Sequence, residues 1–226
     1  MQQFLDQLTL EREDVQDDLE SVRLSVPKCR VGDMGCGWGF TTLSLTLELR
    51  PSECIGIDQF VRDSIFGVPA FEDVQSLFSV IRAGVIDQAS EVQRDDLRND
   101  LRRLFQEGYY PVLRASDIVT GENLPSELDL VYCKKVLKNI FDGAYANPRS
   151  GAEAVASAIR NIAHAVKRGG QVCIVEPACE INFPSFFGQS GLKLVSQRRI
   201  ERGEIIGSRR QTLYRAQYIQ YVSERV

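Results

Sequence analysis

Val31-Gly32-Asp33-Met34-Gly35-Cys36-Gly37-Trp38-Gly39 decides the fold of this chain. Residues 28–34 are predicted to form a short strand, and residues 39–49 are predicted to form a helix that ends before Pro51. The three glycines between the two elements permit a tight turn and let a ligand approach the backbone. Free N–H groups at the start of the helix favour a carboxylate or a phosphate. The stretch therefore predicts a strand, a ligand-binding turn and a helix.

Strands and helices alternate along the rest of the chain. Apolar runs predict further strands, and Ser150 with Glu153 forms a capping box at the start of a helix over 150–166. Short turns between such elements imply right-handed crossovers and a parallel sheet. We expect an α/β fold, Rossmann-like and doubly wound, with a mostly parallel seven-stranded sheet and a C-terminal antiparallel hairpin. The further strands are expected at 54–58, 110–115, 128–133, 171–176, 192–202 and 211–222.

An acidic segment precedes this pattern. Residues 1–24 carry seven acidic residues and two arginines, and their spacing predicts a helix. We expect a solvated helix that packs outside the core, and an interaction arm is the alternative. The packing residues would be Phe4, Leu5, Leu8, Val15 and Leu19.

The segment between the second and third strands is oversized. Residues 60–109 separate them, whereas a whole βαβ unit needs about 30 residues. Two helices are predicted here, over 71–85 and 87–106. We expect a helical insertion that forms a lid or a homodimer contact.

Length and charge limit the class of protein. The 226 residues are 43% hydrophobic, which suits one α/β domain spanning 1–226. The net charge of −4 gives no reason to expect a nucleic acid or a membrane as partner. No apolar run approaches the ~20 residues of a membrane span. The first residues do not resemble a secretory signal, so we expect a cytoplasmic protein.

The cysteines predict neither a metal site nor a disulfide framework. Six cysteines are present without a CxxC pair, and His164 is the one histidine. Cys54, Cys133 and Cys173 lie in predicted strands and are expected to be buried, and all six cysteines are expected to be reduced thiols.

Three details narrow the choice of ligand. The glycines follow GxGxG rather than the GxGxxG of dinucleotide sites, since residue 40 is Phe. Asp33, two residues before Gly35, would repel a pyrophosphate and suits a ligand with an ammonium group. Asp58 ends the second strand, where a carboxylate can accept hydrogen bonds from both ribose hydroxyls. That last feature also occurs in NAD sites, so it leaves both ligands open.

In their order and spacing, these motifs resemble class I S-adenosylmethionine-dependent methyltransferases. Residues 31–39 resemble the first motif, 55–58 the second strand with its ribose acid, and 114–118 the segment whose Asp117 contacts the adenine amino group. Residues 128–133, 167–172 and 190–192 resemble the later strands and turns, so the resemblance covers about 26–222 apart from the insertion. It implies S-adenosylmethionine as cofactor, bound by Asp33, Gly35, Cys36, Gly37, Trp38, Asp58, Gln59, Ser116, Asp117, Ile118 and Cys133.

The chain also departs from the family pattern. Many small-molecule members carry a histidine after Val-Leu on the helix that follows the fourth strand, where this chain has Lys138-Asn139. No Asn-Pro-Pro-Tyr or Asp-Pro-Pro-Tyr ends the fourth strand, so base amino methylation of that type is not supported. An acidic pair for aminopropyl transfer is also missing.

Methyl transfer from a sulfonium is an in-line displacement in which positioning and desolvation supply much of the rate. A base is needed only where the acceptor must lose a proton. The catalytic candidates are Glu176 and Lys134. Glu176 is a base, a substrate anchor or a strand-end carboxylate held by N–H groups. Lys134 either reaches an anionic substrate or is solvated together with Lys135. We expect His164 at the surface, late in its helix.

Several other side chains allow two interpretations, one functional and one structural. Trp38 covers the methionine end of the cofactor or packs between helix and sheet. Tyr132 is expected in the core. The basic tail, 192–226, is read as a solvated sheet edge, with an acidic substrate or RNA as the alternative. Phenylalanines that line an acceptor pocket or pack under a loop are Phe183, Phe186 and Phe187.

We therefore expect a methyltransferase that acts on a small molecule. The alternative is a module of the same fold that binds S-adenosylmethionine or a partner without catalysis.

Overall fold

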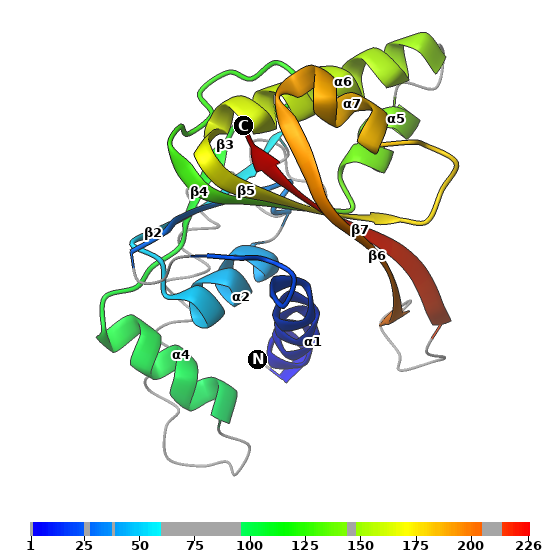
Figure 1. Cartoon of the computed structure of the whole chain (residues 1–226). Coiled ribbons are helices and arrows are strands. Elements are labelled where there is room, and N and C mark those ends of the chain that lie inside the picture. The colour runs from blue at the N-terminus through cyan, green and yellow to red at the C-terminus, as the bar shows by residue number, and fades with distance from the viewer. Residues whose placement is uncertain (1, 25–27, 38, 60–95, 144–147, 205–213) are drawn as a thin grey trace.

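A computed structural model describes residues 2–24, 28–37, 39–59, 96–143, 148–204 and 214–226. These residues contain one seven-stranded sheet in the order β3-β2-β1-β4-β5-β7-β6 (Figure 1). The pairs from β3 through β5 are parallel, and β7 runs antiparallel to both β5 and β6. This confirms the predicted α/β sheet with its C-terminal hairpin. The strands are β1 (Arg30–Met34), β2 (Glu53–Asp58), β3 (Val112–Ala115), β4 (Leu128–Lys134), β5 (Val166–Pro177), β6 (Leu192–Glu204) and β7 (Tyr214–Arg225).

Helices cover both faces of the sheet (Figure 1). On one face lie α1 (Gln2–Leu19), α2 (Phe40–Leu49) and α4 (Asp96–Gln106). On the other lie α5 (Leu137–Gly143), α6 (Pro148–Ala165) and α7 (Pro184–Phe187), with a 3₁₀ turn at Gly188–Ser190. α4 is the end of the predicted helix 87–106, and the predicted helix 71–85 lies outside the described residues. Of the helices that the structure describes, none is long and apolar enough to cross a membrane.

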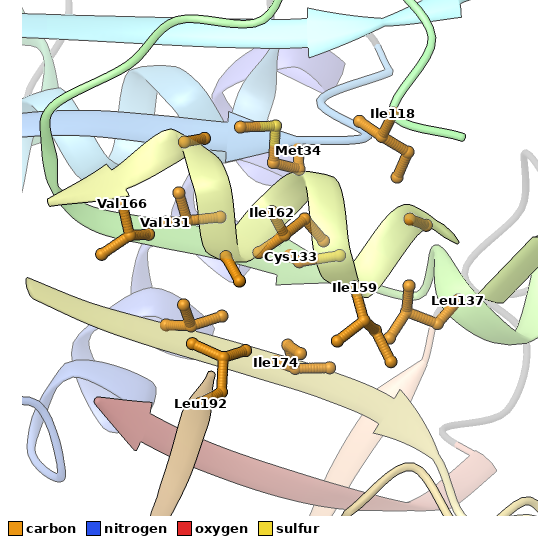
Figure 2. Close-up of a cluster of buried hydrophobic side chains, with 14 of the residues drawn as sticks. Met34, Ile118, Val131, Cys133, Leu137, Ile159, Ile162, Val166, Ile174 and Leu192 are labelled. Atoms are coloured by element: carbon orange, nitrogen blue, oxygen red, sulfur yellow. The ribbon is translucent and has the colours of Figure 1, made fainter. Parts of the chain in front are cut away.

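The larger core lies between the sheet and α6. Ile159 and Ile162 of α6 face Val131 and Cys133 of β4 and Ile174 of β5 (Figure 2). All five side chains are buried, and full burial of an aliphatic side chain contributes about 1.5–3 kcal/mol. The 3.6-residue period of α6 explains this stripe, so this core follows directly from the sequence pattern.

The second core lies on the opposite face of the sheet. Successive side chains of β4 point to opposite faces, so the strand contributes to both cores. Leu130 and Tyr132 join Val15 of α1, Leu45 of α2 and Val222 of β7. Tyr132 is therefore a core residue, as expected. The side chains predicted to pack α1 are buried at Leu8 and Val15.

The acidic helix and the basic tail pair with each other. Asp18 of α1 is fully buried and accepts hydrogen bonds from the Tyr132 hydroxyl and the Arg202 guanidinium. The Arg202 side chain is 5% exposed and lies 3.3 Å from an Asp14 oxygen, and Arg198 lies 3.2 Å from Asp17. The prediction of two separate solvated surfaces is therefore wrong at these residues, since opposite charges from the two ends of the chain meet over the sheet.

Candidate functional site

The candidate site lies where parallel strands end. β1 lies between β2 and β4. The chain adds β2 and β3 on one side of β1 and β4 and β5 on the other, so the strand order reverses beside β1. Doubly wound sheets bind ligands at the carboxyl ends of the strands beside such a switch point. The glycine turn, which begins with Gly35 and Gly37, follows β1 here. Asp58 and Lys134 end the two neighbouring strands.

The glycine turn is tied to β2. The N–H groups of Gly35 and Cys36 both donate to the Ile57 carbonyl, at 2.7 and 3.0 Å. The Gly37 N–H donates to a carboxylate oxygen of Asp58 at 2.9 Å. Gly35 and Gly37 have φ of 80° and 51°, in the left-handed region that favours glycine. The turn and the predicted ribose acid therefore form one unit.

The two glycines form a matched pair for a stability test. A Cβ on Gly35 would lie 2.1 Å from Val136 Cγ2, whereas a Cβ on Gly37 would meet nothing within 4 Å. Both alanine variants incur about 1–2 kcal/mol of left-handed strain. We expect Gly35→Ala to lose a further 1–3 kcal/mol or so through overpacking. Urea unfolding of the two variants checks this, and equal losses would contradict the packing described.

A cavity of about 610 Å³ opens beside the turn. Residues from the ends of β1, β2 and β3 and from α5 and α6 line it. Seven of the predicted cofactor residues are among them: Gly35, Gly37, Asp58, Gln59, Ser116, Asp117 and Ile118. The other lining residues are Ile57, Val119, Lys135, Val136, Asn139, Ile140, Gly143 and Ala154. The structure thus brings together residues from three separate predicted motifs.

The loop after β3 presents Asp117 to this cavity. The Ser116 N–H donates to the Asp58 carbonyl at 3.3 Å, which joins the loop to β2. One carboxylate oxygen of Asp117 accepts the Val119 N–H at 2.7 Å. The backbone of the loop therefore fixes the orientation of this carboxylate.

Three other predicted cofactor residues that the structure describes do not line this cavity. Asp33 is 1% exposed, and Cys36 and Cys133 are also buried. Trp38 lies outside the described residues. Asp33 accepts a hydrogen bond from the Thr42 hydroxyl at 2.7 Å, and burial raises its pKa to about 7. Asp33 therefore lies behind the turn, where it anchors the first turn of α2.

The raised pKa of Asp33 predicts a pH dependence of stability. Between the unfolded value near 4 and about 7, the native carboxyl holds a proton that the unfolded chain releases, so stability falls as pH rises. Asn in its place still accepts from Thr42 and does not titrate. We expect Asp33→Asn to lose about 2–3 kcal/mol less than the wild type between about pH 5 and pH 8. Urea unfolding at the two pH values measures this, and parallel losses would contradict it.

The two catalytic candidates hold structural positions. Glu176 is fully buried, and its carboxylate accepts the N–H groups of Val136, Leu137 and Lys138 at 2.9, 2.8 and 3.1 Å. Burial raises the pKa of Glu176 to about 7. These contacts match the reading of a strand-end carboxylate held by N–H groups.

Lys134 is directed to α1. Its ammonium donates to Glu11 and Asp14 at 2.7 and 2.6 Å, and its side chain is 6% exposed. The solvated reading of Lys134 is therefore wrong. Within the described part of the chain, neither Lys134 nor Glu176 lines the cavity.

Other candidates lie away from the cavity. His164 is exposed near the end of α6, as expected. Phe183 and Phe187 are buried and pack edge-on against Tyr221, with ring centroids 6.1 and 5.8 Å away. These contacts match packing under a loop.

Most of the lining residues that the sequence did not single out as ligand contacts come from residues 135–143, which include the turn after β4 and α5. Val136, Asn139 and Ile140 follow β4 directly, and that position was the one sign available in the sequence. Lys135 has a φ of 61°, and its ammonium lies 5.0 Å from the centre of the Tyr218 ring.

Comparison with known proteins identifies the fold. No family model matches the sequence, and no curated protein matches it. Solved structures do match. TehB from Haemophilus influenzae is 14% identical with a TM-score of 0.56, and the match covers 95% of this chain and 62% of that one. This chain thus spans less than two thirds of the TehB chain.

Two further structures extend the comparison. Magnesium protoporphyrin IX methyltransferase (ChlM) from Synechocystis PCC 6803, with bound SAH, is 14% identical with a TM-score of 0.52, over 98% of this chain and 84% of that one. The [4+2]-cyclase SpnF is 12% identical with a TM-score of 0.56, over 95% and 80%.

The sheet order and the helices on both faces define a doubly wound α/β protein with a cavity at its switch point. More particularly, the chain has the fold of the class I S-adenosylmethionine-dependent methyltransferases. Since a cyclase also matches, the fold by itself does not name the reaction.

Proposed function

We propose that this protein is an S-adenosylmethionine-dependent methyltransferase acting on a small-molecule acceptor. One observation carries the proposal: the cavity brings the glycine turn together with Asp58 and Asp117, three features that lie far apart in the sequence. Its volume of about 610 Å³ is within the range of small-molecule and cofactor sites.

The residues present fit this cofactor. Asp58 would accept from the ribose hydroxyls, and the Gly37 N–H, which donates to its carboxylate, helps to hold it in place. Asp117 would accept from the adenine amino group, and Ile118 and Ile57 supply apolar surface beside it. Open space at Gly37 leaves room for a ligand against the backbone.

The residues behind the turn would act indirectly. The carboxylate of Asp33 would favour the positive charge of the methionine end, and a nearby cation would in turn favour its ionised form. Cys36 and Cys133 would shape the wall from behind. For Trp38 the proposal rests on its place in the sequence motif.

The chemistry is then largely positioning. The bound cofactor supplies a methyl group on a sulfonium, which is already an activated leaving group. The chain's own residues bind and orient the reactants and exclude water from them. The acidic and basic side chains among the described lining residues are Asp58, Asp117 and Lys135.

Incubation with methyl-labelled S-adenosylmethionine and a broad panel of small acceptors tests this function. Labelled product with any acceptor, lost in Asp58→Ala, supports the proposal. Binding of S-adenosylhomocysteine (SAH) without transfer to any acceptor supports the alternative, a non-catalytic binding module. The contacts of Glu176 and Lys134 favour that alternative, because each of these catalytic candidates makes structural contacts instead of facing the cavity. Absence of binding contradicts both.

We also propose that residues 1–226 act as one domain, that the protein works in the cytoplasm, and that 60–109 forms a homodimer contact. These proposals rest on the composition and spacing of the sequence. Light scattering of the full chain and of a variant with charge reversals in 60–109 tests the last of them.

A further inference from the structure

One face of α6 borders the cavity. Ala154 lines it, and Ser157 and Asn161 follow at spacings of three and seven residues, which places all three on the same side of the helix. The Asn161 side-chain amide donates to the carbonyls of Ile118 and Val119 at 3.0 and 2.9 Å. The Ser157 hydroxyl donates to the Val119 carbonyl at 2.9 Å. Two side chains of α6 therefore hold the loop that carries Asp117.

The loop fits closely against Asn161. Gly121 has a φ of 76°, and its N–H donates to the Asp117 carbonyl at 2.9 Å. A Cβ at Gly121 would lie 2.8 Å from the Asn161 amide carbon and nitrogen. Two features thus favour glycine at position 121: its left-handed backbone conformation and the close approach of the Asn161 side chain.

The chemistry of the amide suits this position. Asparagine offers two N–H donors on one nitrogen, and two backbone carbonyls face that nitrogen. Aspartate has nearly the same shape but offers only acceptors when ionised, so it would direct negative charge at both carbonyls. Leucine would remove both donors without adding charge.

We infer that Asn161 is a positioning residue that sets the preference of the site for adenine. It fixes the backbone of Ile118 and Val119, and the Val119 N–H in turn holds the carboxylate of Asp117. That carboxylate can accept from the 6-amino group of adenine. The inference rests on the proposed function, since it assigns the Asp117 end of the cavity to adenine.

A pair of ligands tests the inference on the full chain. SAH carries the 6-amino donor, and S-inosyl-L-homocysteine carries a carbonyl oxygen in its place. Calorimetry with both gives a preference ratio for the wild type and for N161D, N161L and S157A. Asp117→Ala is the reference for a lost adenine contact, and Arg160→Gln, an exposed position on the same helix, is the matched control.

We expect the wild type and R160Q to prefer SAH. In N161D and N161L the affinity for SAH should fall about tenfold or more, and the affinity for the inosyl ligand should fall much less. The preference ratio should therefore approach that of D117A. S157A keeps both amide donors of Asn161 and should lower the ratio by less, about two- to threefold; it remains informative if the Asn161 variants do not fold.

Two outcomes would overturn the inference. If the variants, S157A included, lose affinity for both ligands equally, Asn161 has only a structural role. If they keep the wild-type affinity for both ligands, Asn161 has no role in the site. A wild type that binds neither ligand is a different result, because it refutes the proposed function on which the inference rests.

Discussion

Replacing Arg202 with methionine is expected to lower the free energy of unfolding by about 3–5 kcal/mol. Arg202 is almost fully buried and bonds to the carboxylate of Asp18, which is completely inaccessible to solvent. Burial raises the pKa of Asp18, and the charge of Arg202 opposes that shift. Without the guanidinium, a buried carboxylate loses its charge partner, and removing one partner of such a pair costs far more than the pair contributes.

Urea unfolding measures this loss, with two controls. Arg199→Met removes an exposed arginine on the same strand and should stay within about 0.5 kcal/mol of the wild type. The double variant Asp18→Asn with Arg202→Met removes both charges and should recover part of the loss. If R202M behaves like R199M, the pairing of α1 with the tail does not stabilise the fold.

The second large effect is expected at Asp58. Asp58→Ala should weaken SAH binding about 100-fold or more, because two charge-assisted hydrogen bonds to ribose are lost at about 1.5–3 kcal/mol each. The Gly37 N–H also loses its acceptor. Calorimetry of the wild type and the variant measures the change.

Two variants separate this contact from general damage. Asp58→Asn keeps an acceptor for the Gly37 N–H and should give an intermediate loss of about tenfold. Glu122→Gln changes an exposed side chain near the cavity and should bind SAH like the wild type. Wild-type affinity in D58A would remove Asp58 from the proposed site.

The fold was predictable because its strands are short apolar runs bounded by turn residues. The 3.6-residue spacing of apolar residues at 150–166 and the apolar run at 54–58 predicted α6 and β2 to within a few residues. The pairing of Asp18 with Arg202 was not predictable, since 184 residues separate them and the sequence shows only two regions of opposite charge.

The site shows the same division. Asp58 and Asp117 belong to local motifs at strand ends, so their positions could be predicted. Lys134 and Lys135 look alike in sequence but diverge in space. Lys134 continues the alternation of β4 toward α1, whereas Lys135, with a φ of 61°, leaves the strand and lines the cavity. The contribution of Ala154 depends on how α6 packs, which no local pattern records.

The central claim is that the glycine turn, Asp58 and Asp117 hold S-adenosylmethionine rather than a dinucleotide. Titration calorimetry of the full chain with SAH and, separately, with NAD tests it most directly. We predict saturable binding of SAH to one site per chain, lost in D58A, and no binding of NAD. Binding of NAD without binding of SAH would contradict the claim.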